Sequence, residues 1–434
     1  MNKLGWKYEL CKLDTIKYLS KNELVGLSII CKALRAKLFR YVFREVILKN
    51  VLLGFEHLSP NEIDPELVEL VISRYKEDLK HLISNTRSLV YQNDYNDCSL
   101  IFIPRLFLNL NSLHLYETKF TLTIFQTLMN ELISLKKLSI NCCLLIAFDS
   151  HNNHPYLQLP SNLISLKIKS GALMRPRFGS RLNLRKYLEC CNLSDLQPMN
   201  FAVERDSLQK LKILIIDQIG EEFMETQNGL LFAGHQLEHF STDISLIRGA
   251  IFTNLYNLTS LTLTLANIEE FPISISEINI LTLQNLKELV IKGGFTLENN
   301  DEVIISSLQK LLYIGKNVER LTVPYIKFYK LSIENTVHSL SNLKELSLFK
   351  AINVETLSPT NFPKALKTLN LHSFNPKRLD INNVKNCNGL EVISIFYSDY
   401  SNFIVNFEDT KFAKEIQGWK VINFPGSSIK CYKN

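Results

Sequence analysis

Glycine and proline are both scarce in this sequence, at 15 and 13 of 434 residues. These low numbers exclude a collagen-like chain and a proline-rich extended chain. Hydrophobic residues make up 46% of the chain and charged residues 21%, which is typical of a folded protein. No apolar run approaches the roughly 18–20 residues that a membrane-spanning helix needs. We therefore expect a folded chain with no membrane partner.

The sequence also lacks the common motifs of catalysis and nucleotide binding. No G-x-x-x-x-G-K-[ST], G-x-G-x-x-G, H-E-x-x-H or G-x-S-x-G pattern occurs. Cys142, Cys143, His151 and His154 are metal-ligand residue types, but they fall on a repeated structural position and on a loop-like stretch. We interpret them as structural residues. The sequence therefore predicts no enzymatic activity, no metal and no cofactor.

Cysteine usage and charge indicate where the protein is found. The nine cysteines include two adjacent pairs, Cys142–Cys143 and Cys190–Cys191, which do not suggest a disulfide framework. The N-terminal stretch MNKLGWKYELCKLD carries charges where a signal peptide needs an apolar core. We expect the cytoplasm or the nucleus. The net charge of +6 is mild for this length and permits an acidic partner without favouring nucleic acid.

Leucine is the abundant residue, at 72 of 434 positions, and it recurs in the pattern L-x-x-L-x-L. The spacing averages about 26 residues, inside the range of 20–29 residues typical of leucine-rich repeats. One wide interval holds a degenerate copy around Leu184–Leu188. The central apolar residues of the copies are Leu113, Leu138, Leu166, Leu214, Phe240, Leu261, Leu289, Leu321, Leu346, Leu369, Ile393 and, in a weak copy, Ile422.

The pattern predicts a strand in each repeat. Alternating apolar residues share one face of a short strand, and that face is buried only when repeats stack into a parallel sheet. A small residue recurs three positions after the last apolar residue, as at Thr118, Cys143 and Gly171. Between the strands, 123–135 and 303–314 have apolar residues at helical spacing. An α/β solenoid is the expected fold.

These features resemble the leucine-rich-repeat superfamily over about residues 85–425. The resemblance implies a horseshoe with parallel strands on its concave face and an outward-facing ladder of residues, about 4.8 Å apart between strands. The ladder is mostly small and polar, and it contains only one lysine, Lys167. Aromatic residues gather just past the C-terminal strands, and we expect them to contact a protein substrate. They are Phe349, His372, Phe396 and Tyr397.

Residues 1–45 lie outside the repeat and have a helical pattern. Ser20 and Asn22 can cap a helix that begins near Glu23. A single apolar stripe follows at helical spacing, formed by Leu24, Leu27, Ile30, Cys31 and Leu34.

This N-terminal stretch resembles the second half of an F-box, a module that binds a Skp-type adaptor of cullin ubiquitin ligases. The Leu-Pro with which that family opens has no counterpart here. The residues that carry the resemblance are Tyr18, Leu19, Glu23, Leu24, Leu27, Ser28, Ile30, Cys31, Lys32, Leu34 and Arg35. The resemblance implies that the adaptor contacts Tyr18, Leu19, Leu24, Leu27, Ile30, Cys31 and Leu34.

The chain is thus expected to contain an F-box-like helical module (1–45), a transition with capping repeats (46–105), a leucine-rich-repeat solenoid (106–425) and a C-terminal tail (426–434). Within the first two of these segments, the sequence pattern predicts strands at 43–48 and 87–94 and a helix at 66–83.

We expect the substrate-recognition subunit of a Skp–cullin–F-box type ubiquitin ligase, with an unidentified protein substrate. Such a subunit performs no chemistry and acts by raising the effective concentration of its substrate near the ligase. The alternative is a stand-alone leucine-rich-repeat scaffold with a helical cap, which predicts that the 24–34 stripe is buried against the first repeats. The adaptor hypothesis predicts a partly exposed stripe. A nucleic-acid-binding solenoid ranks last because the ladder lacks a basic stripe.

Overall fold

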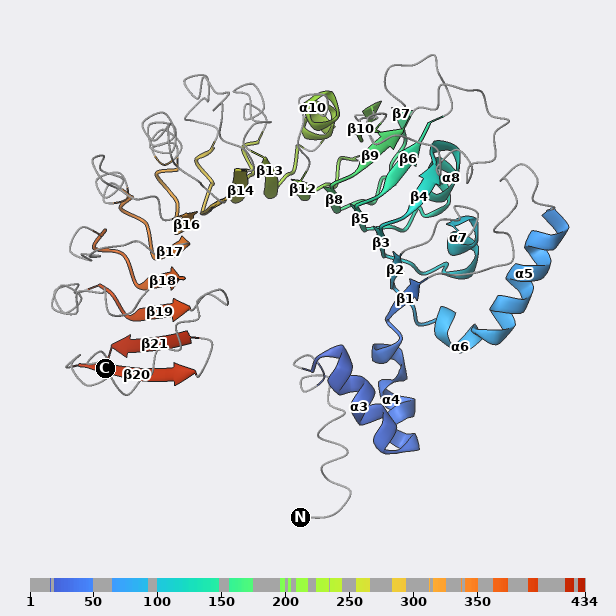
Figure 1. Cartoon of the computed structure of the whole chain (residues 1–434), viewed down its shortest axis with the longest axis horizontal. Coiled ribbons are helices and arrows are strands. Elements are labelled where there is room, and N and C mark those ends of the chain that lie inside the picture. Colours follow the sequence, from blue (N-terminus) through green and yellow to red (C-terminus); the bar gives the residue numbers. More distant parts are fainter. Residues whose placement is uncertain are drawn as a thin grey trace. The chain divides into compact units, whose positions relative to one another are not determined.

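Short strands, one from each repeat, are the main element of this chain in the computed structural model. The chain divides into two units, the first formed by Met1–Leu211 with Glu222–Gly234 and the second by Lys212–Glu221 with His235–Asn434 (Figure 1). The residues described are 16, 19–49, 65–92, 100–147, 156–174, 196–199, 202–203, 208–217, 224–233, 235–243, 255–265, 283–293, 312, 315–324, 337, 340–349, 362–373, 389–396, 418–424 and 428–433.

The first unit contains a row of parallel strands in a single register. Central residues pair from strand to strand, Val46 with Leu89, Leu89 with Leu113, and on through Leu138 to Leu166. The strands predicted at 43–48 and 87–94 are confirmed as the first two of this row. In order, the row consists of β1 (Glu45–Lys49), β2 (Ser88–Gln92), β3 (Ser112–Tyr116), β5 (Lys137–Asn141) and β8 (Ser165–Lys169).

A second, shorter sheet in the first unit was not predicted. Here β4 (Lys119–Thr121), β6 (Leu144–Ile146) and β9 (Ala172–Met174) pair in parallel, and β10 (Leu196–Pro198) pairs antiparallel with β9. A further pair joins β7 (Tyr156–Leu157) to β11 (Ala202–Val203). The chain therefore forms two strands in some repeats, one on each side of the tight turn.

The turn between these two strands explains the recurring small residue. Glu117, Cys142 and Ser170 have φ values of 51°, 53° and 45°, the left-handed region that reverses the chain sharply. The next residue is buried in each repeat, as at Cys143. At Gly171 an added Cβ would lie 3.1 Å from the Met199 side chain, so the slot has little room for more atoms.

Helices of the first unit lie in the segments that return from one strand to the next (Figure 1). The predicted helix 123–135 is confirmed as α8 (Leu122–Glu131), where the Thr121 hydroxyl accepts a hydrogen bond from the Ile124 N–H at 3.3 Å. The predicted helix 66–83 is interrupted at Leu79, whose φ of −108° and ψ of 11° are not helical. Among the described residues, the helices that follow the first strand are α5 (Pro65–Asp78), α6 (Lys80–Ile83), α7 (Phe102–Leu106), α8 and α10 (Met224–Ala233), and two further helices precede that strand.

Two other predicted features fall outside the described residues: the degenerate repeat around 184–188, and all of the 303–314 helix except Leu312, which is buried. No helix in the described part of the chain is long and apolar enough to cross a membrane.

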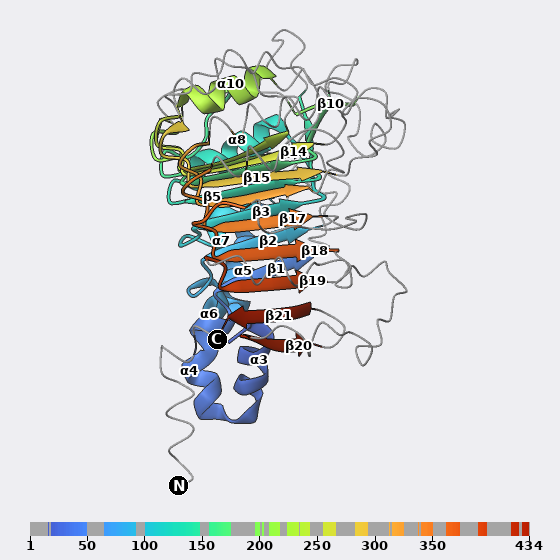
Figure 2. The same ribbon diagram turned by 90° about the vertical axis from the view of Figure 1, so that its left-hand side faces the viewer.

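The second unit contains a longer row of parallel strands, again in one register (Figure 2). Its central residues pair from Leu214 to Phe240 and onward to Ile393. The row consists of β12 (Ile213–Asp217), β13 (His239–Asp243), β14 (Ser260–Leu265), β15 (Glu288–Gly293), β16 (Arg320–Pro324), β17 (Glu345–Phe349), β18 (Thr368–His372) and β19 (Val392–Phe396).

The last two strands differ from the prediction. β21 (Ser428–Lys433) pairs antiparallel with β19, and β20 (Trp419–Phe424) pairs antiparallel with β21. The prediction of a further parallel repeat centred on Ile422, followed by a tail over 426–434, was therefore wrong. Only 425–427 separate β20 from β21, and such a short connection produces a hairpin because a parallel crossover needs about a dozen residues. The hairpin pairs the open edge of β19.

The core of both rows is a column of inward-facing apolar residues. Central residues from Leu89 in β2 to Ile393 in β19 are at most 2% exposed. Full burial of one such side chain contributes about 1.5–3 kcal/mol. The fold is confirmed as a mixed α/β parallel solenoid preceded by a pair of helices.

An asparagine before several strands joins neighbouring repeats. The Asn285 side-chain amide donates to the Tyr256 carbonyl at 2.7 Å, and Asn317 donates to the Gln284 carbonyl at 2.8 Å. Asn162 makes the same bond to Ile133 at 2.9 Å. These residues stand four positions before the central apolar residue, so the bonds recur at a fixed place in the repeat. In the sequence, this position gives the pattern N-L-x-x-L-x-L. The leucine pattern alone does not include the asparagine.

Gly389 occupies this same position before β19, and we predict that it cannot be replaced. A Cβ at Gly389 would lie 2.3 Å from the Lys364 carbonyl oxygen, a backbone atom that cannot turn aside. Gly389→Ala should lower the free energy of unfolding by about 1–3 kcal/mol, as overpacking does. Chemical denaturation measures this change.

Gly26→Ala and Gly229→Ala are matched controls, because a Cβ there meets no atom within 4 Å and both residues are helical. They should stabilise the chain by about 0.5–1 kcal/mol. A Gly389→Ala variant as stable as these two would contradict the prediction.

Candidate functional site

The helical module begins at a capping box around Ser20. The Ser20 hydroxyl accepts a hydrogen bond from the Glu23 N–H at 3.3 Å, and the Glu23 carboxylate accepts one from the Ser20 N–H at 2.6 Å. These bonds lower the pKa of Glu23. Ser20 is thus confirmed as the cap, while Asn22 lies within the first turn of α3 (Lys21–Ile30).

Cys31 divides the predicted single helix in two. Its extended backbone, with φ −158° and ψ 159°, separates α3 from α4 (Lys32–Val42). The Arg35 side chain donates to the Ser28 carbonyl at 3.3 Å and so satisfies one of the last carbonyl groups of α3. The prediction of one continuous helix through 24–34 was therefore wrong.

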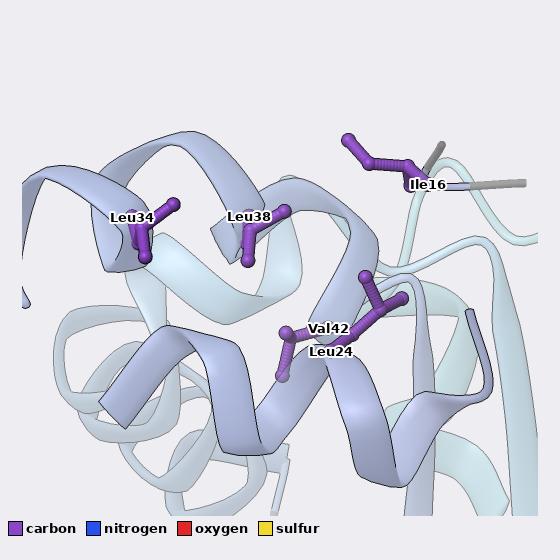
Figure 3. Close-up of a cluster of buried hydrophobic side chains, with 5 residues drawn as sticks. All are labelled: Ile16, Leu24, Leu34, Leu38 and Val42. Carbon is purple, nitrogen blue, oxygen red and sulfur yellow. The ribbon is translucent and has the colours of Figure 1, made fainter. Parts of the chain in front are cut away.

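The module has a hydrophobic core of its own. Its buried residues come from α3, α4 and the preceding segment, and they are Ile16, Leu24, Leu34, Leu38 and Val42 (Figure 3). Partly buried residues packed against this core are Leu19, Leu27, Cys31, Tyr41 and Phe43. Of the predicted adaptor contacts, Leu24 and Leu34 thus face inward, and Leu19, Leu27 and Cys31 lie at the margin. Tyr18 lies outside the described residues.

Three large apolar side chains remain exposed on α3. Val25 is 36% exposed, Ile29 67% and Ile30 55%. Val25 and Ile29, at positions i and i+4, share one face of the helix, and Ile30 follows Ile29 about 100° further around the helix axis. We call these three residues the α3 patch. Of these three residues, only Ile30 was among the predicted adaptor contacts. Val25 and Ile29 were missed because each lies one position away from a residue of the predicted stripe. Most of that stripe in fact forms the core of the module.

The predicted substrate-contact residues come together on three neighbouring strands. Phe349 ends β17, His372 ends β18 and Phe396 ends β19. The rings of Phe349 and His372 have centroids 4.1 Å apart at 4°, and those of His372 and Phe396 are 4.5 Å apart at 9°. We call these three residues the aromatic stack. Tyr397 lies outside the described residues.

The surroundings of the aromatic stack suit binding rather than chemistry. Burial lowers the pKa of His372, so the imidazole is neutral at pH 7. Near this ring, the Asn370 side-chain amide donates to the Glu345 carboxylate at 2.8 Å and to the Ser347 hydroxyl at 3.1 Å. These bonds fix the outward polar side chains of β17 and β18. Phe349 is 37% exposed and presents an apolar edge to solvent. Exposed aromatic rings of this kind are common in surfaces that contact other proteins.

The cysteine pair was interpreted as structural, and the described residues fit this. Cys142 is exposed at the turn, whereas burial raises the pKa of the Cys143 thiol to about 11. His151 and His154 lie outside the described residues. Within the described ranges, no group of three or more His, Cys, Asp and Glu residues could hold a metal ion.

Comparisons with known proteins assign no family: no family model matches this chain, and no curated protein matches it.

We predict that the Phe349 ring keeps the pKa of His372 low. Phe349→Ala removes one of the two rings that shield the imidazole, so water regains access to the charged form and the pKa should rise toward its usual value near 6.5. Histidine NMR titration measures this shift, with His372→Gln to assign the signal. A lowered pKa in Phe349→Ala would instead mean that the ring face stabilises the imidazolium.

Phe424→Ala is the matched control, because Phe424 is 43% exposed and lies outside the aromatic stack. It should leave the pKa of His372 unchanged.

Proposed function

We propose that this chain is the substrate-recognition subunit of a Skp–cullin–F-box type ubiquitin ligase. The N-terminal helical module would bind a Skp-type adaptor, and the strand face of a leucine-rich-repeat solenoid would bind the protein substrate. The chain would act in the cytoplasm or the nucleus and would promote transfer by proximity, without catalytic residues of its own.

The α3 patch carries this proposal. Exposed Val25, Ile29 and Ile30 lie together on a helix whose own core is already complete. Exposed apolar groups that lie close together on a helix are stabilised when a partner covers them. The F-box resemblance of this same stretch supplies the identity of that partner.

The aromatic stack supports the substrate half of the proposal. Its three rings occupy one outward column, so a bound chain would meet them as one continuous apolar strip. Interface energy is commonly concentrated in such aromatic residues.

The alternative is a stand-alone leucine-rich-repeat scaffold, and one observation favours it. Leu24 and Leu34 are buried within the helical module, so the module needs no partner to complete its core. That hypothesis predicted burial against the first repeats, but the residues that form and border this core all lie between 16 and 43.

Co-purification with a Skp-type adaptor tests the proposal. The full chain should elute with the adaptor as a 1:1 complex in gel filtration. Ile29→Asp with Ile30→Asp should weaken that complex at least about tenfold, because two charges enter the apolar contact. Circular dichroism should show an unchanged fold, since both side chains are exposed.

Leu70→Asp with Leu108→Asp is the matched control. These residues are 67% and 75% exposed and lie outside the helical module, so the complex should persist. A well-folded chain that forms no complex would overturn the ligase proposal and leave the scaffold.

A further inference from the structure

Charge is distributed differently over the outward faces of the two rows. Each strand has two inward-facing residues that alternate with outward-facing ones. The residue between the inward two, and the residues on either side of them, point outward. In β1, β2, β3, β5 and β8 these positions hold four lysines against one glutamate. From β12 to β19 they hold three acidic residues that are not buried, Asp217, Glu288 and Glu345, against Lys292 and Arg320, while Asp243 is buried. The first face is therefore positive and the second negative.

The positive charge of the first unit is concentrated on adjacent strands. Lys137 is on β5, and Lys167 and Lys169 are on β8, where Ser139 pairs with Lys167 and Asn141 with Lys169. His114 on β3 pairs with Ser139. We call His114, Lys137, Lys167 and Lys169 the basic patch.

His114 shows that these charges lie close enough to interact. Burial lowers its pKa; the Glu45 carboxylate opposes this effect, and the positive charges of Lys167 and Lys137 add to it. The Ser112 hydroxyl lies 2.9 Å from the His114 Nε2 atom and fixes the ring within the patch. Glu45, the acidic residue of this face, is itself paired with Lys21 at 3.4 Å.

Two lysines of the basic patch, Lys137 and Lys167, differ from lysines of the second unit in their partners. Lys212 pairs with Glu238 at 2.6 Å, and Lys344 with Glu319 and Lys367 with Glu391, both at 2.8 Å. Among the described residues, neither Lys137 nor Lys167 forms an ion pair. Their charge is therefore left for a partner to neutralise.

We propose that the basic patch binds an acidic segment of a partner protein in an extended conformation. Lys137 on β5 pairs with Ser165, so Lys167 lies one strand across and two residues along, roughly 8 Å away. Side chains on the same side of an extended peptide are about 6.6 Å apart, so alternate carboxylates of such a peptide can reach both lysines. Small Ser112, Ser139 and Ser165 between the charged residues let a peptide backbone approach closely. The proposal concerns the strand face alone and does not require an adaptor.

A protein segment fits the patch better than a nucleic acid does. The patch contains three lysines and no arginine, and it spans only β3, β5 and β8. Nucleic-acid sites usually present a longer stripe of Lys and Arg along one face.

Fluorescence anisotropy with the full chain, without adaptor, tests the proposal. The probe is a labelled peptide of alternating Glu and Ser, and the comparison probe is an oligo(dT) strand of equal charge. The acidic peptide should bind, and more weakly as salt rises. Lys137→Glu with Lys167→Glu should weaken binding about tenfold or more, because it converts attraction into repulsion. Lys137→Arg with Lys167→Arg should retain it.

Lys364→Glu with Lys420→Glu is the control of equal charge, at exposed positions of the second unit. It should change the affinity less than about twofold. An equal loss of peptide affinity in this control would mean that net charge alone causes the weaker binding, and it would overturn the proposal. Tighter binding of oligo(dT), or no peptide binding at low salt, would overturn it as well. Adaptor binding is not involved, so neither result bears on the ligase proposal.

Discussion

The in-register stacking of one inward apolar column is the constraint on which this structure depends. No single strand of the repeat can bury its apolar face, so each needs the next strand in the same register. Backbone bonds maintain that register: the N–H groups of Lys287 and Glu288 both donate to the Thr259 carbonyl of the preceding repeat, at 2.9 and 3.0 Å. A slip by one residue would turn every central leucine toward solvent. The core and the hydrogen-bond ladder therefore reinforce each other.

The same register determines what the outward face can do. Because equivalent positions of neighbouring strands are about 4.8 Å apart, residues far apart in sequence form continuous columns. Phe349, His372 and Phe396 occupy one column, and their ring spacings of 4.1 and 4.5 Å are close to the strand spacing. The basic patch arises in the same way from β3, β5 and β8. Substitutions at outward positions can thus change binding without changing the core, since the inward column carries most of the stability.

The repeat could be predicted from sequence because its signal is periodic, whereas the departures from it are local. Leucines at a fixed spacing predicted the parallel strands and brought the aromatic stack together. The break at Cys31 was missed because helical periodicity runs through 24–34 without a proline, and the one glycine of this range, Gly26, lies within α3 rather than at the break. The second sheet was missed because its strands have only three residues, too few to show an alternation. The C-terminal hairpin was missed because Trp419–Phe424 has the same apolar pattern as the repeat strands. Only the short connection after this strand indicates that the next strand is antiparallel.

The break at Cys31 also separates two roles that a single stripe would have combined. A side chain that closes the core of a small helical module cannot at the same time be offered to a partner. Leu24 and Leu34 are used within the module, which leaves Val25, Ile29 and Ile30 for contact. A module of about 30 residues buries little apolar surface, so losing either leucine would unfold it rather than weaken an interface. Charge substitutions on the α3 patch are therefore informative about binding, whereas substitutions in the matched core positions report only on folding.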